Sequence, residues 1–144
     1  MEHWDAAQYL KFKQQRTRPA IDLAARIPLE HPEKIADIGC GPGNSTAVLK
    51  QRFPGAKIVG ADSSADMIAA AEQAHPEMQF IQCDAQTELE KLGQDYDVVF
   101  SNACLQWIPD HPVMIPKMLQ MLRPGGVLAV QIPVNYEEPI HKII

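Results

Sequence analysis

From residue 34 onward, short apolar runs alternate with longer stretches in which apolar and polar residues follow a helical period. The apolar runs cover residues 34–38, 56–61, 78–82, 96–101 and 126–132. Each is nearly continuous in hydrophobic residues, which is typical of strands buried on both faces of a parallel sheet. The pattern therefore predicts a parallel sheet with helices on both sides.

Helices are expected between these strands, over residues 44–53, 64–75, 86–92 and 111–122. Ser63 or Ser64 is a suitable N-cap for the second of them. Pro116 lies inside the last one, where it removes a backbone hydrogen bond and favours a kink. Strands that alternate with helices predict an α/β fold, a doubly wound Rossmann-like parallel sheet with right-handed crossovers.

Two further helices are predicted ahead of the first strand. The first covers residues 6–16 and presents Tyr9, Phe12 and Arg16 on one face. The second follows Pro19 and ends before Pro28. Its apolar stripe consists of Ala20, Leu23, Ala24 and Ile27. We expect residues 1–30 to form a helical cap on a core of residues 31–144, within a single domain.

Composition narrows the class of protein. The chain has 144 residues, 46% hydrophobic and 22% charged, which is ordinary for one globular domain. Its net charge of −5 disfavours nucleic acid as a partner. No apolar run reaches the ~20 residues of a membrane span, and the N-terminus lacks the pattern of a signal peptide. Three cysteines without CxxC spacing indicate reduced thiols and no metal site, so we expect a cytoplasmic protein.

The segment "IADIGCGPGNST", residues 35–46, carries glycines at alternate positions, Gly39, Gly41 and Gly43. This GxGxG spacing differs from the GxGxxG of dinucleotide-binding loops. The loop connects the first strand to the first helix, where α/β sheets bind ligands. Glycines there let a ligand approach the main chain. Asn44 and the residue after it open the helix, with their amides directed at the ligand.

Aspartates follow three successive predicted strands: Asp37, Asp62 and Asp84. Each alone is also typical of a turn or a helix N-cap. An acid at position 37 repels a pyrophosphate but suits an ammonium group, whereas Asp62 is placed to accept hydrogen bonds from both ribose hydroxyls. Together they favour a ligand with an amino group, a ribose and no phosphate, as in S-adenosylmethionine.

Five segments resemble, in order, the motifs of class I S-adenosylmethionine-dependent methyltransferases. They are "IADIGCGPGNST", "IVGADSS", "QCDA", "YDVVFSNACLQWIPD" and "LRPGGVLAV", and they extend over residues 35–132. The N-terminal pattern "W…Y…F…R.RP..DL", together with "GPGNST", "NACLQWIPDH" and "QIPVNYEEP", is similar to the trans-aconitate 2-methyltransferase family over nearly the whole chain.

The resemblance implies roles for individual residues. Asp37 would lie beside the methionine amino group, Asp62 would take the ribose hydroxyls, and Asp84 with Ala85 would flank the adenine. Asn102 would face the methionine moiety and position the reacting groups. The full cofactor-binding set implied is Asp37, Gly39, Gly41, Gly43, Asn44, Asp62, Ser63, Asp84, Ala85 and Asn102.

The reaction implied is methyl transfer to a carboxylate of a small polycarboxylic acid, giving a monomethyl ester and S-adenosylhomocysteine. A carboxylate with a pKa near ~4 is already ionised at neutral pH and needs no general base. Such a substrate requires cations, for which Arg16 and Arg18 are the candidates, and Tyr9 and Trp107 would line the pocket. The arginines are equally typical of a solvated surface, and the aromatic residues of ordinary core packing.

Alternatives remain open from the sequence. The acceptor is either a carboxylate or another group, such as a carrier-bound malonyl ester or an amine. A nicotinamide-dependent oxidoreductase is disfavoured by the GxGxG spacing and by Asp37. Class I methyltransferases usually carry two more strands after the fifth, whereas this chain ends at "EPIHKII", where we expect a helix to begin. A non-catalytic cofactor-binding piece is therefore the other alternative, and the oligomeric state is left open.

Overall fold

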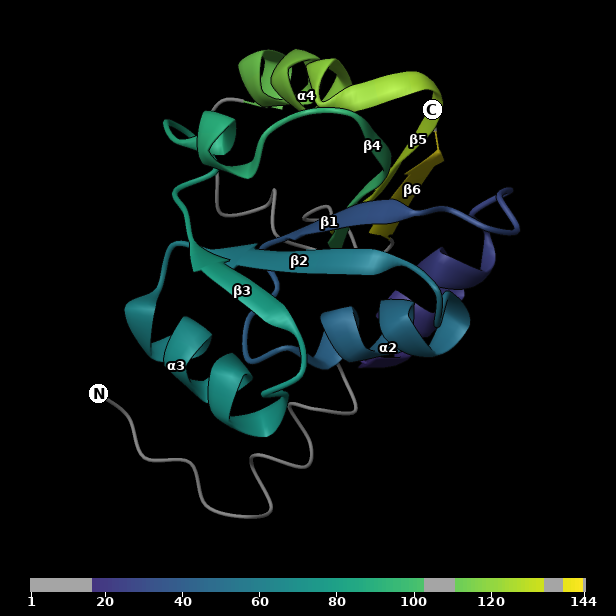
Figure 1. Cartoon of the computed structure of the whole chain (residues 1–144). Helices are drawn as coiled ribbons and strands as arrows, with labels where there is room; N and C mark the ends of the chain where they lie inside the picture. The colour runs from purple at the N-terminus through teal and green to yellow at the C-terminus, as the bar shows by residue number, and fades with distance from the viewer. Residues whose placement is uncertain (1–16, 103–110, 134–138, 144) are drawn as a thin grey trace.

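The computed structural model describes residues 17–102, 111–133 and 139–143. Within these residues the strands form one sheet in the order β3-β2-β1-β4-β5-β6, seen in Figure 1. The strands are β1 (Lys34–Ile38), β2 (Lys57–Asp62), β3 (Gln79–Gln82), β4 (Tyr96–Asn102), β5 (Leu122–Pro133) and β6 (Pro139–Ile143). Strands β1 to β5 pair in parallel, and β6 is antiparallel to β5.

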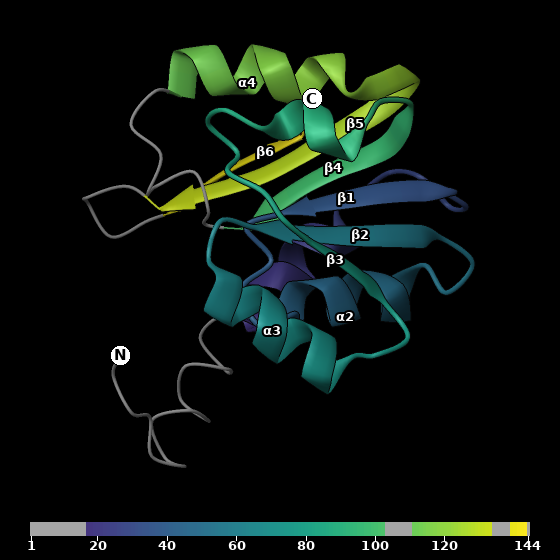
Figure 2. The same cartoon turned by 60° about the vertical axis from the view of Figure 1, so that its left-hand side comes forward.

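Helices cover both faces of the sheet, as Figures 1 and 2 show. The helices are α2 (Asn44–Arg52), α3 (Ala65–Ala74), α4 (His111–Gln120) and the short 3₁₀ helix η1 (Leu89–Leu92). Helix α4 lies on one face, and α2 and α3 lie on the other. A helical segment over residues 17–25 precedes β1. The predicted doubly wound α/β sheet is therefore confirmed.

The apolar core is divided between the two faces. On the α4 face, Met118 lies in one buried cluster with Val99 and Leu128. On the α2 face, Leu23 of the N-terminal helical segment shares a cluster with Leu49 of α2. The predicted stripe of this segment is fully buried; its residues are Ala20, Leu23, Ala24 and Ile27. The strands thus read as continuously apolar because both faces are covered.

Several boundaries differ from those predicted. The fifth strand begins at Leu122, because Leu122 already pairs with Tyr96, after which a register shift accommodates the Pro-Gly segment before Val127. The helix expected over 86–92 is reduced to η1, which Gly93 ends with φ 82°. The helix expected after Pro19 already includes residues 17–19 and ends at residue 25.

The C-terminal segment is a further difference. A helix is expected to begin at "EPIHKII", but residues Pro139–Ile143 form β6 along the outer edge of β5. The antiparallel pairing gives hydrogen-bond partners to an edge of β5 that would otherwise be unpaired, which is the physical reason a strand is preferred. The predicted helix over residues 6–16 lies outside the described residues.

Candidate functional site

The glycine loop joins β1 to α2 and has a backbone shape that requires its glycines. Gly39, Gly41 and Gly43 all have positive φ, at 75°, 56° and 97°. The amides of Gly39 and Cys40 both donate hydrogen bonds to the Ala61 carbonyl, at 2.7 and 2.9 Å. These two backbone hydrogen bonds therefore hold the loop against the carboxyl end of β2.

Gly43 has a second role, in packing. A Cβ atom at this position would lie 2.8 Å from Cδ2 of His75, at the end of α3, and 3.4 Å from the Ala71 Cβ. Gly43 is also the N-cap of α2 and has no side chain with which to cap it. This glycine thus allows α3 to approach the start of α2, a packing role that the glycine pattern alone does not separate from ligand binding.

Asp37 is completely buried near the end of β1. Its Oδ2 accepts hydrogen bonds from Ser45 Oγ at 2.7 Å and Thr46 Oγ1 at 2.8 Å, both in the first turn of α2. The amino end of a helix carries partial positive charge, which also favours a carboxylate there. The Ser45 side chain therefore points into the protein, where it orients Asp37.

Asp62 ends β2 and is bonded to the glycine loop. Its Oδ2 accepts from the Gly41 amide at 3.0 Å, and its Oδ1 accepts from the Ser64 amide at 2.9 Å. Its backbone carbonyl accepts from the Cys83 amide at 2.9 Å, which joins the ends of β2 and β3. Ser64, and not Ser63, is the N-cap of α3, because its hydroxyl accepts from the Met67 amide.

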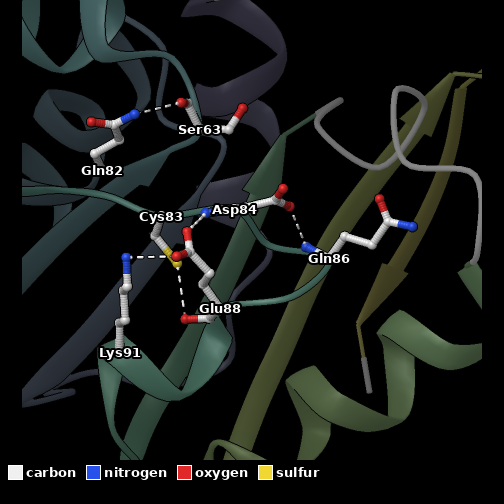
Figure 3. Close-up of polar contacts among 7 residues, drawn as sticks. All are labelled: Ser63, Gln82, Cys83, Asp84, Gln86, Glu88 and Lys91. Carbon is white, nitrogen blue, oxygen red and sulfur yellow. Dashed lines mark hydrogen bonds and ion pairs between the residues drawn. The ribbon is translucent and has the colours of Figure 1, made fainter.

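Asp84 begins a turn just after β3, shown in Figure 3. Its exposed carboxylate accepts a hydrogen bond from the Gln86 amide at 2.8 Å, while its own amide donates to Glu88 Oε1 at 2.9 Å. A cleft of about 410 Å³ lies on this side of the turn. Its lining residues are Ser63, Gln82, Asp84, Glu88 and Lys91. Ser63 is exposed there, and its carbonyl accepts from Gln82 Nε2.

The predicted aspartates come together through strand register. Asp37 is paired with Gly60, two residues before Asp62, and Asp62 is paired with Gln82, two residues before Asp84. The three acids therefore follow the carboxyl edge of neighbouring strands β1, β2 and β3. This arrangement requires the parallel pairing that the sequence pattern predicted.

Buried polar side chains continue this edge onto β4 and β5. Asn102 is 2% exposed, and it is in register with Gln131, which is 5% exposed. Asp37, Asn102 and Gln131 each lie two residues beyond a core residue of the α2 face, so all three belong to that face. Those core residues are Ile35, Phe100 and Ala129. Gln131 was not predicted, although a glutamine inside the apolar run "GVLAVQI" was the available signal.

Other predicted site residues contribute less to this geometry. Ala85 is buried in the turn after Asp84, and Asn44 is the first residue of α2. Arg18 is exposed on the N-terminal helical segment. Tyr9, Arg16 and Trp107 lie outside the described residues. Among the residues that are described, no His, Cys, Asp or Glu cluster has the make-up of a metal site, and no helix is long and apolar enough to cross a membrane.

The charges around the turn alter the ionisation of its side chains. Lys91 pairs with Glu88 at 2.7 Å, and this contact lowers the pKa of Glu88 and raises that of Lys91. The Cys83 thiol is buried and donates to the Glu88 carbonyl. Its burial, and then the Glu88 carboxylate, raise its pKa. Glu88 is therefore a carboxylate at neutral pH, and Cys83 is a neutral thiol.

Comparison with known proteins agrees with this geometry. The sequence profile of the methyltransferase domain family matches residues 35–126, the segment that contains the loop and the strand-end acids. The chain therefore belongs to the methyltransferase domain family.

Trans-aconitate 2-methyltransferases from Azoarcus sp. (strain BH72) and from Escherichia coli (strain K12) are both 49% identical to it over all 144 residues. The chain spans 56% of the length of each of these relatives. Among solved structures, phosphoethanolamine N-methyltransferase 2 from Haemonchus contortus, in complex with S-adenosyl-L-methionine, is 27% identical, with a TM-score of 0.69. That alignment covers 80% of this chain and 28% of the other.

Proposed function

We propose that this chain binds S-adenosylmethionine at the carboxyl edge of its sheet. The observation that carries the proposal is the placement of Asp37, Asp62 and Asp84 at the ends of β1, β2 and β3, beside a loop of positive-φ glycines. Each acid faces a donor on the cofactor in this proposal: the methionine ammonium, the ribose hydroxyls and the adenine amino group.

Unpartnered buried atoms at the same edge support a polar ligand. Within the described part of the chain, Asn44 Nδ2 and Gln131 Oε1 are buried without a hydrogen-bond partner. Such groups are costly unless a ligand or water satisfies them. Asn44 begins the helix that follows the loop, and Gln131 lies in register with Asn102. The donor and acceptor set therefore fits the zwitterionic methionine end of the cofactor.

We further propose that the reaction is O-methylation of a carboxylate of a small polycarboxylic acid, with trans-aconitate as the substrate. The 49% identity to trans-aconitate 2-methyltransferases along the whole chain supports this choice. The cofactor supplies a methyl group activated by a sulfonium. The substrate carboxylate is already ionised, so this chain has to position it in line with the methyl group and exclude water.

Substrate charge implies cations near the site. Arg16 and Arg18 are the proposed carboxylate-binding residues, with Tyr9 and Trp107 as walls of the pocket and Asn102 as a positioning residue. In this proposal residues 1–30 cap a single cofactor-binding unit, residues 31–144. The buried thiol of Cys83, which is not part of a disulfide, is consistent with the cytoplasmic location that we propose.

Turnover of radiolabelled S-adenosylmethionine tests the reaction. The natural full-length protein would be assayed against a panel of small di- and tricarboxylic acids, an amine and a carrier-bound malonyl ester. We expect the label to appear in a monomethyl ester of trans-aconitate, and we expect trans-aconitate to have the highest kcat/KM of the acceptors tested. A higher kcat/KM with the amine or the malonyl ester would show that the proposed acceptor is wrong. No turnover with any acceptor would contradict the assignment as an enzyme.

The arginine assignment has its own test in the same assay. Arg18→Ala is expected to raise KM for trans-aconitate at least about tenfold, equivalent to about 1.4 kcal/mol, without changing cofactor affinity. Arg26→Ala is the matched control, because Arg26 is an exposed arginine just after the same helical segment. A wild-type KM for Arg18→Ala would remove Arg18 from the substrate site.

A further inference from the structure

We propose that Glu88 is a positioning residue that sets the cofactor's base specificity by holding the Asp84–Ala85 backbone in place. The inference rests on the proposed function, in which Asp84 and Ala85 contact adenine. Glu88 does not touch the base in this proposal. It acts through the turn between Asp84 and Glu88, which presents the Asp84 carboxylate and the Ala85 amide to the base; Figure 3 draws the side chains of Asp84 and Glu88.

The turn is closed from several directions. Glu88 Oε1 accepts from the Asp84 amide at 2.9 Å, and the Asp84 carbonyl accepts from the Glu88 amide at 2.7 Å. The Asp84 carbonyl also accepts from the Thr87 amide, and the Asp84 carboxylate accepts from Gln86. Glu88 is therefore bonded to Asp84 through both its side chain and its backbone, which fixes both ends of the segment.

Two neighbours hold Glu88 in this orientation. Lys91 Nζ lies 2.7 Å from Glu88 Oε2, so the oxygen that does not bind Asp84 is neutralised. Cys83 Sγ donates to the Glu88 carbonyl at 3.2 Å. In Figure 3 the Glu88 side chain extends toward the Asp84 amide, and Lys91 approaches it from another side. Lys91 also offsets the repulsion expected between two nearby carboxylates.

The fixed turn presents a donor next to an acceptor. The Asp84 carboxylate is exposed and accepts, whereas the Ala85 amide makes no hydrogen bond among the described residues. Adenine offers the complementary pair, an amino group that donates and a ring nitrogen that accepts. Hypoxanthine reverses both, because it has a carbonyl and a ring N–H. A rigid turn therefore discriminates between the two bases, and a loosened turn discriminates less.

Calorimetry with S-adenosylhomocysteine and S-inosylhomocysteine tests the inference on the full-length protein. Glu88→Ala is expected to weaken the binding of S-adenosylhomocysteine about three- to tenfold, which is the effect of one hydrogen bond. It should reduce the preference for S-adenosylhomocysteine over S-inosylhomocysteine by a similar factor. Glu88→Gln retains an oxygen acceptor for the Asp84 amide, and we expect it to restore most of the preference.

Glu90→Ala is the matched control, because Glu90 is an exposed carboxylate of the same 3₁₀ helix. It is expected to leave both affinities within about twofold of wild type. If Glu88→Ala does not fold, Glu88→Met keeps the aliphatic length and carries the same prediction.

If Glu88→Ala keeps the wild-type preference for the adenosyl compound, or loses affinity for both compounds equally, the positioning role is overturned. The proposed function remains intact in either case. Failure of the wild-type protein to bind S-adenosylhomocysteine would instead overturn the proposed function, and this inference with it.

Discussion

The Gly41 amide donates a 3.0 Å hydrogen bond to Asp62 Oδ2, across 21 residues of sequence. This contact joins the glycine loop after β1 to the acid that ends β2. Since the other oxygen of Asp62 accepts from the Ser64 amide, the carboxylate shapes two backbone segments at once. A residue predicted from the sequence to bind the ribose therefore also maintains the loop on which cofactor binding depends.

Asp62→Ala is expected to lower both cofactor affinity and stability. Loss of charge-assisted ribose bonds should cost about 2–4 kcal/mol of S-adenosylhomocysteine binding. Loss of the Gly41 and Ser64 contacts should lower the unfolding free energy by about 1–3 kcal/mol, because two amides lose a charged acceptor. Titration calorimetry and denaturant unfolding measure the two effects.

Asp66→Ala is the control for this pair of measurements, since Asp66 is an exposed acid in the first turn of α3. It should leave affinity unchanged and alter stability by less than about 1 kcal/mol. Normal cofactor binding by Asp62→Ala would contradict its role in the site, and unchanged stability would contradict its role in the loop.

Gly43→Ala should destabilise the protein by about 1–3 kcal/mol. The backbone at Gly43 is left-handed, with φ 97°, so any residue with a Cβ is strained there, and the added Cβ would lie 2.8 Å from the His75 ring. Adding His75→Ala should recover part of the loss, by relieving the overlap but not the backbone strain. Gly55→Ala is the control, because a Cβ there meets nothing within 4 Å. Equal unfolding midpoints for the two alanine variants would refute this account of Gly43.

Asp97 should prove structural, in contrast to the strand-end acids. This buried carboxylate accepts from the Glu33 and Lys34 amides at 2.7 and 3.0 Å and pairs with Arg123. Asp97→Ala should lower the unfolding free energy by about 2–4 kcal/mol and leave cofactor affinity unchanged. Arg123→Ala should cost less than about 1 kcal/mol, because half of that side chain is exposed. A large affinity loss in Asp97→Ala would show that its effect reaches the site.

Stability should decrease at alkaline pH through Cys83. Its burial raises the pKa of the thiol, so the folded state retains the proton after the unfolded chain has lost it. The contribution is complete below the ordinary thiol pKa, about 8.5, and is lost as pH rises through the higher value of the folded protein. Burial acts in the same direction on the pKa of Tyr96.

Unfolding free energies measured between about pH 7 and 10 test this linkage. The unfolding free energy of Cys83→Ala should decrease less steeply with pH than that of the wild type. The decrease that remains should come from Tyr96. A slope that is identical with and without the thiol would exclude Cys83 as a source of the pH dependence.

The arrangement of strands β1 to β5 could be predicted from the sequence, because strands buried on both faces are continuous runs of apolar residues. The runs that contain Ile35, Val59 and Val99 are apolar on both sides, and their alternation with helical stretches indicates a parallel sheet. Parallel pairing then places Asp37, Asp62 and Asp84 at one edge. Register thus converts three separate motifs into a single candidate site.

Individual side-chain contacts and the packing of helices could not be predicted from the sequence pattern. Nothing in the spacing of Glu88 and Asp84 separates a supporting bond from a solvated helix face. The packing of His75 against Gly43 depends on how closely two helices approach, and that is set by tertiary structure. Strand β6 was missed because its pairing with β5 depends on an available edge and not on its own sequence pattern.

The central claim is that the loop and the three strand-end acids select S-adenosylmethionine over a dinucleotide. Titration calorimetry of the full-length protein with S-adenosylhomocysteine and with NAD tests it most directly. The account predicts saturable binding of S-adenosylhomocysteine and no detectable binding of NAD, because Asp37 repels a pyrophosphate. Tighter binding of NAD than of S-adenosylhomocysteine would contradict it.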